Sequence, residues 1–202
     1  MIKNIIFDIG NVLMPFAYRS FFENFGYDEN TVERLCKATA QSPDWNELDR
    51  GVLSYEEILE RFIRNDPQLE DIIRKVFVDL HGILGLYDYT EDWIRQLKEA
   101  GYGVYYLSNF FQKAEEDCEE RMGFLELTDG GILSYKDKVT KPDKQIYELL
   151  LDRYGLKAEE CVFLDDTKKN IDGAGTVGIK GILFKNRAQA VEELQKLGVK
   201  TK

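Results

Sequence analysis

Short apolar runs along this chain alternate with stretches in which apolar residues recur at helical spacing. Four runs have the apolar, β-favouring character of strands buried on both faces: residues 5–7, 104–107, 162–164 and 181–184. Apolar positions at i, i+3 and i+4 predict helices over residues 90–100, 143–154 and 188–197. Strands that alternate with helices predict right-handed βαβ units, and therefore an α/β fold with a doubly wound parallel sheet.

Residues 14–84 interrupt this alternation. Helical patterns recur there near 18–25, 30–40, 54–64 and 69–79, separated by Gly, Pro and Asp, and no strand pattern is evident. We therefore expect an all-helical cap domain at 14–84, inserted after the first strand and placed over the carboxyl edge of the sheet. The core domain would comprise residues 1–13 and 85–202. Trp45, Tyr55 and Phe62 are expected in the apolar core of the cap.

Composition and charge narrow the classes of partner. The 202 residues are 44% hydrophobic and 32% charged, which is enough apolar material for a core and argues against disorder. With 27 Lys and Arg against 37 Asp and Glu, the net charge is −10. A chain this acidic is poorly suited to nucleic acid or to an anionic membrane. We expect a small-molecule ligand instead.

The cysteines and the longest apolar runs predict the cellular compartment. Cys36, Cys118 and Cys161 are far apart and odd in number, and no CxxC occurs, so neither a zinc site nor a disulfide framework is indicated. No run approaches the roughly 18 apolar residues of a membrane span, and the apolar start is too short for a signal peptide. The sequence predicts a soluble, cytoplasmic protein.

Polar residues that carry chemistry follow the predicted strands. Open α/β sheets bind ligands outside the carboxyl ends of their strands, so these positions are expected to converge on one edge. The residues at the strand ends are Asp8, Gly10, Ser108, Asn109, Asp165 and Asp166. Lys141 stands immediately before Pro142, which opens a predicted helix and is expected to bring the lysine to the same edge.

The expected cluster has a consistent chemical logic. Asp8, Asp165 and Asp166 would repel one another unless a cation lies among them, and Mg²⁺ suits an all-oxygen site. A carboxylate can attack a phosphoryl group and form an aspartyl-phosphate. Ser108 and nearby backbone amides would hold the phosphoryl oxygens, and Lys141 would supply fixed positive charge in the transition state.

Four ordered segments resemble the motifs of the haloacid dehalogenase (HAD) superfamily of phosphohydrolases. They are Phe-Asp-Ile-Gly-Asn-Val-Leu at 7–13, Leu-Ser-Asn at 107–109, Lys-Pro-Asp at 141–143, and the segment 163–170 that begins Phe-Leu-Asp-Asp. The resemblance covers nearly the whole chain and implies a Rossmann-like HAD core. The insert at 14–84 is similar to the helical cap of the C1 subfamily, which lies between motifs one and two.

The resemblance assigns the metal site and the nucleophile. It implies that Asp8 is the nucleophile, and that Asp8, the Gly10 carbonyl and Asp166 bind Mg²⁺. Asp165 would reach the ion directly or through water. The remaining positions would serve the phosphoryl group.

Four further residues receive roles by the same comparison. Ser108 and Asn109 would hold the phosphoryl group, and Lys141 would bridge that group and Asp8. Asn170 would orient Lys141. The implied activity is that of a phosphoric monoester hydrolase, with Mg²⁺ as cofactor.

Gly10 departs from the usual first motif of the family, which carries a second Asp two residues after the nucleophile. That Asp protonates the leaving group and activates the hydrolytic water. The Asp-x-Gly-Asn-Val form occurs in a branch that includes sugar-phosphate phosphatases. We therefore expect a Mg²⁺-dependent phosphatase that hydrolyses a small phosphorylated metabolite, such as a sugar phosphate, through an aspartyl-phosphate.

Two alternatives stay open. A 2-haloacid dehalogenase also uses an Asp nucleophile without the second Asp, but it needs no metal, so the adjacent Asp165 and Asp166 count against it. A non-catalytic phosphate-binding or interaction protein would explain Gly10 by loss of turnover. For all of these readings, the cap residues that would contact a ligand are set by the folded structure of the cap.

Three other features have structural explanations that compete with functional ones. Residues 173–178 match G-x-G-x-x-G, but the run lies late in a predicted helix rather than directly after a strand, which favours close helix packing over nucleotide binding. His81, the single histidine, is expected at a helix end rather than in catalysis. Arg50 lies in an expected cap turn, where a surface arginine is the default and substrate contact the alternative.

Overall fold

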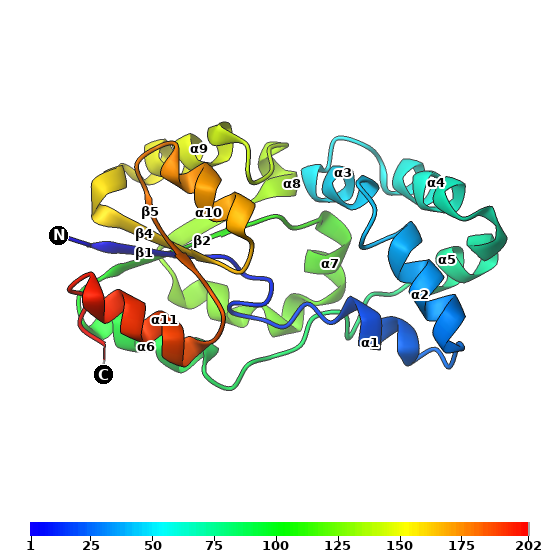
Figure 1. Ribbon diagram of the computed structural model, residues 1–202, viewed down its shortest axis with the longest axis horizontal. Helices are drawn as coiled ribbons and strands as arrows, with labels where there is room; N and C mark the ends of the chain where they lie inside the picture. The colour runs from blue at the N-terminus through cyan, green and yellow to red at the C-terminus, as the bar shows by residue number, and fades with distance from the viewer. Residues whose placement is uncertain (202) are drawn as a thin grey trace.

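The computed structural model describes residues 1–201 and is built around a five-stranded sheet (Figure 1). Its strands are β1 (Asn4–Phe7), β2 (Gly103–Ser108), β3 (Gly130–Leu133), β4 (Cys161–Asp165) and β5 (Lys180–Leu183). The strand order is β3-β2-β1-β4-β5 and every neighbouring pair is parallel. The predicted α/β fold with a doubly wound parallel sheet is therefore confirmed.

Helices cover both faces of the sheet. Helices α6 (Thr90–Glu99) and α11 (Arg187–Lys196) lie against one face, and α9 (Lys144–Tyr154) and α10 (Lys168–Gly175) against the other (Figure 1). In α6 the buried residues Trp93, Ile94 and Leu97 follow the apolar spacing that predicted this helix. Residues 5–7 of β1 and 161–164 of β4 are apolar because these central strands are buried between the two layers.

Strand β3 was not predicted from the sequence. Its first two residues are Gly130 and Gly131, and glycine is uncommon in strands. A Cβ on Gly131 would lie 2.3 Å from the carbonyl oxygen of Tyr106, so no side chain fits there. Packing against Tyr106 thus explains why this strand lacks the apolar run that marks the other four.

Shorter elements connect the strands of the core. After β2 come α7 (Gln112–Asp117) and the 3₁₀ turns η2 (Glu119–Arg121) and η3 (Gly123–Leu127). Helix α8 (Ser134–Asp137) follows β3, and η4 (Ala158–Glu160) precedes β4. Helix α8 is the element through which the core contacts the helical insert most closely, because it packs against α3 (Asp44–Arg50).

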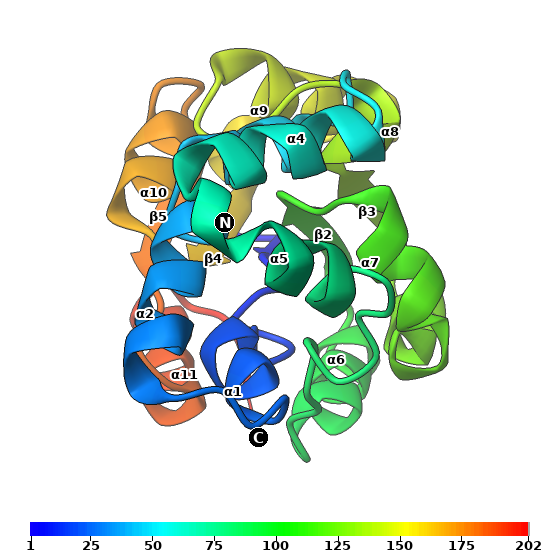
Figure 2. The ribbon, with the colours of Figure 1, turned by 90° about the vertical axis from the view of Figure 1, so that its right-hand side faces the viewer.

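The segment between β1 and α6 carries five helices grouped beyond one end of the sheet (Figures 1 and 2). They are α1 (Tyr18–Glu23), α2 (Glu29–Ala38), α3, α4 (Tyr55–Asn65) and α5 (Glu70–Val76), with the 3₁₀ turn η1 (Pro67–Leu69) before α5. Four of these match the helical patterns predicted from the sequence. The short helix α3 was missed, although Pro43 at its start and Gly51 at its end, with φ of 65°, are ordinary helix boundary signals.

Aromatic side chains fill the interior of the insert. Trp45 stacks on Phe62 with ring centroids 6.0 Å apart, and both are buried. Tyr55 is half-buried and donates a hydrogen bond of 2.8 Å to the carbonyl oxygen of Phe77. Trp45 also meets Phe111, which follows β2, at 5.3 Å in an edge-to-face arrangement. The apolar interior of the insert therefore continues into the core.

Two chain segments connect the insert to the core, and they run side by side. Phe16 and Leu84 form an antiparallel bridge, the Ala17 amide donates to Ile83 and the Gly85 amide donates to Pro15. This pairing supports a division into a core and a cap at residues 14–84, which stays a prediction. Within residues 1–201 no helix is long and apolar enough to cross a lipid bilayer.

Candidate active site

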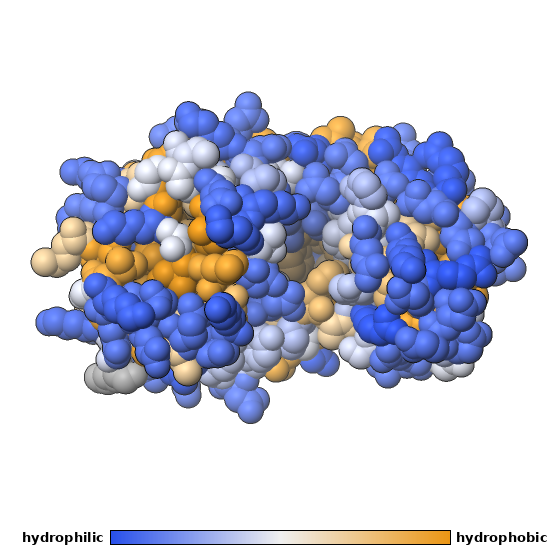
Figure 3. Space-filling model, viewed as in Figure 1, coloured by the Kyte–Doolittle hydropathy of each residue, from blue (hydrophilic) through white to orange (hydrophobic). Residues whose placement is uncertain are grey.

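A cavity opens between the carboxyl edge of the sheet and helix α3 of the insert. In Figure 3 the surface is hollowed between the two halves of the molecule. The cavity has a volume of about 230 Å³, many times the space that one water molecule needs. Its polar lining residues are Asp8, Asn11, Asp49, Ser108, Asn109, Lys141, Asp166, Thr167, Lys169 and Asn170.

Strand pairing brings three aspartates together at this edge. Phe7 of β1 is level with Leu164 of β4, and the amide of Asp8 donates to the Leu164 carbonyl at 2.8 Å. Asp8 and Asp165 therefore leave adjacent strands at the same height. One carboxylate oxygen from each of Asp8, Asp165 and Asp166 lies within 4.8 Å of the others. These residues meet at the edge where the sequence placed them.

Lys141 joins two of these aspartates in a buried ion-pair triad. Its Nζ lies 2.8 Å from Asp8 Oδ1 and 2.7 Å from Asp165 Oδ2, while Lys141 is 1% exposed. Burial lowers the pKa of Lys141, but the attraction of Asp165 and Asp8 outweighs this effect and raises it. Burial raises the pKa of Asp8, and Lys141 opposes that rise. Two carboxylates against one ammonium leave the triad short of one positive charge.

Asp165 is held by hydrogen bonds on both of its oxygens. Besides the bond from Lys141, it accepts one from the Thr167 amide at 2.8 Å and two from Asn170 Nδ2 at 3.0 and 3.1 Å. Asn170 therefore contacts Asp165 rather than Lys141. An orienting effect of Asn170 on the lysine would pass through this carboxylate. Asp165, saturated in this way, is less available than Asp8 or Asp166 to ligate an ion directly.

Ser108 is the last residue of β2 and Asn109 follows it, and the two face the cavity differently. The Asn109 side chain accepts a hydrogen bond from the Lys141 amide at 2.7 Å and donates one to the Lys141 carbonyl at 3.0 Å. Its amide group is thus occupied in holding Lys141, which leaves its backbone N–H as the group able to meet a ligand. Ser108 lines the cavity and its hydroxyl donates a hydrogen bond of 3.4 Å to the Asn109 carbonyl oxygen. The nearby Ser108 side chain also opposes the rise of the Asp8 pKa.

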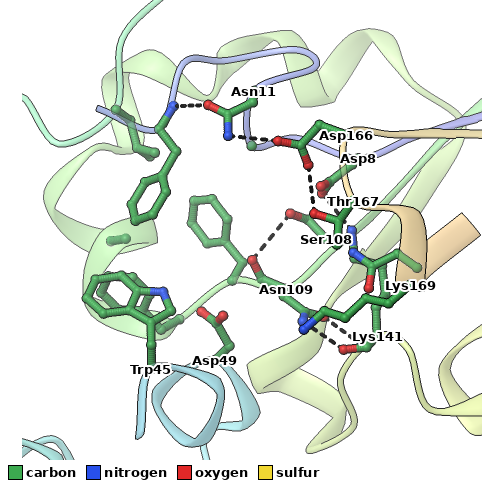
Figure 4. Close-up of a pocket in the computed structure, with 17 residues that line it drawn as sticks. Asp8, Asn11, Trp45, Asp49, Ser108, Asn109, Lys141, Asp166, Thr167 and Lys169 are labelled. Carbon is green, nitrogen blue, oxygen red and sulfur yellow. Dashed lines mark hydrogen bonds and ion pairs between the residues drawn. The ribbon is translucent and has the colours of Figure 1, made fainter. Parts of the chain in front are cut away.

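Asn11 is a site residue that sequence reasoning quoted but to which it gave no role. Its φ of 58° lies in the left-handed region, which Asn tolerates better than most residues. Its Oδ1 accepts from the Phe16 amide at 3.1 Å and its Nδ2 donates to Asp166 Oδ2 at 2.9 Å (Figure 4). Asn11 therefore ties the turn after β1 to the exposed carboxylate of Asp166. The Gly-Asn pair in a turn was the available signal.

Gly10 lines the cavity and contributes no titratable side chain. Around it, the Met14 amide donates to the Ile9 carbonyl at 2.9 Å and the Asn11 amide donates to the Met14 carbonyl at 2.6 Å. The carbonyl of Gly10 takes no part in this pair of bonds. A Cβ at Gly10 would meet its nearest neighbour, Phe16 Cβ, at 3.9 Å, so the site has room for a Cβ there.

Helix α3 contributes a second residue that sequence reasoning did not single out. Asp49 is 7% exposed, lines the cavity, and stands one turn after Trp45 on the same face of the helix. Within residues 1–201 its carboxyl group has no hydrogen-bond or ion-pair partner. Burial raises the pKa of Asp49 to about 8, although Lys141 and Lys169 oppose the rise.

His81, Arg50 and the glycine-rich run lie outside the described lining of this cavity. His81 is exposed and pairs with Asp79, which raises its pKa. Arg50 forms ion pairs with Asp143 at 3.3 Å and Glu47 at 3.5 Å, as a surface arginine does. In the glycine-rich run, a Cβ at Gly173 would lie 2.7 Å from the Pro142 carbonyl oxygen, which fits the packing explanation for this run.

Curated relatives of the chain include two phosphatases of similar length. It is 25% identical over 195 residues to a sesquiterpene phosphatase of Aspergillus oryzae, covering 96% of each chain. It is 28% identical over 211 residues to the D-ribitol-5-phosphate phosphatase of Bacteroides thetaiotaomicron, covering 96% of this chain and 97% of that protein. It also matches mouse acyl-CoA dehydrogenase family member 10 at 27% identity, but spans only 19% of that protein.

Solved structures share the fold of this chain. A HAD family enzyme of Bacteroides thetaiotaomicron, crystallised with magnesium and inorganic phosphate, superposes with a TM-score of 0.70 at 22% identity, covering 92% of this chain and 95% of that one. A dehalogenase superposes with a TM-score of 0.63 at 18% identity, covering 99% and 98%. The family model for haloacid dehalogenase-like hydrolases matches residues 2–178. The chain therefore belongs to the haloacid dehalogenase-like hydrolase family.

Proposed function

We propose that this hydrolase is a Mg²⁺-dependent phosphatase that cleaves a small phosphorylated metabolite through an aspartyl-phosphate. The observation that carries the proposal is the Asp8 carboxylate, held 2.8 Å from the buried Lys141 Nζ at the floor of the cavity. A fixed ammonium beside a nucleophilic carboxylate is suited to a phosphoryl group, whose charge it compensates. Both curated relatives of similar length are named as phosphatases, which supports the same reading.

The oxygen atoms around Asp8 fit a magnesium ion. Asp8 and Asp166 would bind it through carboxylate oxygens and Gly10 through its carbonyl, with Asp165 at the periphery, directly or through water. Mg²⁺ prefers oxygen ligands and keeps waters that phosphate oxygens replace. When bound, it would offset the charge of the phosphoryl group and of the aspartates. The donor set, with three carboxylates and no nitrogen or sulfur, agrees with this choice of metal.

The protein residues would divide the work as follows. Asp8 attacks phosphorus to give the aspartyl-phosphate, which water then hydrolyses. Lys141 holds Asp8 in position and balances the charge that develops on the phosphoryl oxygens. The Ser108 hydroxyl and the Asn109 backbone amide bind those oxygens. Asn170 and Asp165 act as positioning residues for Lys141.

The remainder of the substrate would occupy the part of the cavity nearer the insert. That wall is apolar and is formed by Phe16, Trp45, Leu84, Phe110, Phe111 and Ala114. We retain a sugar phosphate as the proposed substrate, since aromatic side chains can pack on the apolar face of a sugar ring. The same wall would also accept an isoprenoid chain, and one relative is a sesquiterpene phosphatase. In this proposal residues 14–84 act as a cap that selects the substrate.

A screen of phosphorylated metabolites tests the proposal. Sugar phosphates, prenyl phosphates and para-nitrophenyl phosphate are offered to the enzyme with Mg²⁺ and after EDTA treatment, with Asp8→Asn as the inactive control. We expect phosphate release that requires both Mg²⁺ and Asp8. Phosphate release by Asp8→Asn at the wild-type rate would contradict the assigned nucleophile.

The same screen separates the two alternatives. Chloride release from 2-chloropropionate in the presence of EDTA would identify a dehalogenase. We include this test because a dehalogenase shares the fold of this chain. Phosphate binding without turnover of any substrate would identify a binding protein. The cluster of Asp8, Asp165 and Asp166 favours the phosphatase, because a dehalogenase has no metal to bind there.

A further inference from the structure

Phosphoryl transfer from an alkyl ester needs a proton for the departing oxygen, and Gly10 supplies none. The titratable groups that line the cavity are Asp8, Asp49, Lys141, Asp166 and Lys169. Asp8 is the nucleophile and is paired with Lys141. Asp166 is turned toward Asn11 at the expected metal site. Asp49 is the one carboxyl group in this described lining that has no partner.

Asp49 is also held in a fixed position relative to the core. Its own backbone carbonyl accepts a hydrogen bond of 2.6 Å from Ser134 Oγ, at the start of α8. Two residues later, Gly51 lies so close to Tyr135 that a Cβ there would be 2.8 Å from the Tyr135 Cβ. Helix α3 is therefore docked on the core, and Figure 4 shows Asp49 and Trp45 entering the cavity from the side of the insert, away from Asp8 and Asp166.

We propose that Asp49 is the general acid and base of this enzyme, supplied by the insert in place of the carboxyl group that Gly10 lacks. The inference rests on the proposed phosphatase function. The apolar wall that contains Trp45 would contact the organic part of the substrate, so a carboxyl group one turn away on the same helix face stands on the leaving-group side. A phosphoryl group seated between Ser108 and Lys141 would direct its ester oxygen toward this side.

The surroundings of Asp49 favour its protonated form before reaction. Burial keeps its pKa near 8, as described above, and the charged groups that face it are Lys141, Asp8 and Lys169. The neighbouring Arg50 does not neutralise Asp49, because its guanidinium pairs with Asp143 and Glu47. A carboxylic acid that is neutral near pH 7 is able to donate a proton to a leaving oxygen.

Asp49 gives up a proton in the first half-reaction and regains one in the second, so the protons balance. In the first, the bond between Asp8 and phosphorus forms, the bond from phosphorus to the ester oxygen breaks, and that oxygen keeps the electron pair and takes the proton of Asp49. In the second, the Asp49 carboxylate removes a proton from the attacking water as the new oxygen–phosphorus bond forms. The bond to Asp8 then breaks, which leaves inorganic phosphate, a free Asp8 carboxylate and a protonated Asp49.

A series of leaving groups distinguishes an acid from a residue that only binds substrate. The pre-steady-state rate of phosphoryl transfer is measured for wild type and Asp49→Asn with acetyl phosphate, para-nitrophenyl phosphate, phenyl phosphate and primary alkyl phosphates. We expect Asp49→Asn to slow the alkyl phosphates by about 10²–10⁴-fold, while the substrates with good leaving groups lose little. Asp44→Asn, on the same helix but outside the cavity lining and paired with Arg61 within the insert, is the matched control and should leave every rate unchanged.

Two further measurements guard against a purely structural effect. Thermal unfolding checks that Asp49→Asn is folded, and Asp49→Glu, which keeps a carboxyl group, should recover part of the alkyl phosphate rate. The basic limb of the pH profile for alkyl phosphates should be present in wild type and absent in Asp49→Asn. Failure of Asp49→Glu to recover any rate, together with an unchanged pH profile in Asp49→Asn, would overturn the inference.

Failure of the inference and failure of the proposed function give different results. An equal loss for all leaving groups, or no loss at all, would show that Asp49 positions substrate or is idle, while the phosphatase itself stands. If wild type released phosphate from none of the substrates, even acetyl phosphate and para-nitrophenyl phosphate, the proposed function would fall and the inference with it.

Discussion

The side-chain amide of Asn109 is bonded in both directions to the backbone of Lys141, through a 2.7 Å bond from the Lys141 amide and a 3.0 Å bond to its carbonyl. The two residues are 32 positions apart, so this contact joins the end of β2 to the loop before α9. It determines where the buried ammonium of Lys141 is held, between Asp8 and Asp165.

We predict that Asn109→Ala destabilises the fold and lowers turnover together. Two buried backbone groups of Lys141 lose their partner, which costs about 1–3 kcal/mol for each unsatisfied group. The free energy of unfolding is measured by urea denaturation and kcat with the best substrate from the screen. Asn109→Asp keeps the bond from the Lys141 amide. Its free energy of unfolding and its kcat should therefore lie between those of wild type and Asn109→Ala. Full activity in Asn109→Ala would show that Lys141 needs no such support.

We predict that Asn11→Gly weakens Mg²⁺ binding without unfolding the protein. Glycine tolerates the φ of 58° at this position, so the variant removes the hydrogen bond to Asp166 and the one from the Phe16 amide without straining the backbone. Loss of a residue that orients a metal ligand typically costs about 10–100-fold in affinity. Calorimetric titration with Mg²⁺ measures the effect, and Asp166→Ala should abolish binding. Equal affinity in Asn11→Gly and wild type would contradict the assigned role of Asp166.

We predict that Gly10→Asp rescues Asp49→Asn. The nearest neighbour of a Cβ at Gly10 is 3.9 Å away, so a Cβ is accommodated there, and the carboxyl group of an aspartate would supply the missing proton from the first motif. Hydrolysis of primary alkyl phosphates should rise in the double variant relative to Asp49→Asn alone, with little change for para-nitrophenyl phosphate. A double variant no faster than Asp49→Asn would mean that a carboxyl group at position 10 does not reach the leaving oxygen.

We predict that Asp49 makes the metal-free protein less stable as pH rises. Its folded pKa of about 8 lies above the ordinary value of 3.8, so its contribution to stability is fully present below pH 3.8 and is lost as pH rises through about 8. In urea denaturation between pH 4 and 8, the stability of wild type should therefore fall relative to Asp49→Asn. Parallel curves for the two proteins would show that Asp49 is ionised in the folded state.

The sequence alone was sufficient for most of the sheet and for the cluster of aspartates. Strands β1, β2, β4 and β5 are apolar runs because both faces of a parallel sheet are covered, and such runs are visible without a structure. The carboxyl ends of parallel strands share one edge, so Asp8, Asp165 and Asp166 had to meet once the strands were recognised. Strand β3 was not recognised in the sequence, because close packing against Tyr106 requires glycine at position 131 and so removes an apolar residue from the run.

Only the tertiary structure decided what stands opposite the aspartates. Helix α3 is seven residues long, too short to show a clear apolar period, so neither the helix nor the direction of its side chains was evident from the sequence. Within that helix, Arg50 turns outward to Asp143 while Asp49 turns into the cavity. The two residues are neighbours in the sequence, yet one forms a surface ion pair and the other is a buried carboxyl group. Docking of α3 on α8 sets the rotation of the helix, because long-range packing, and no local pattern, determines which face of a short helix meets the core.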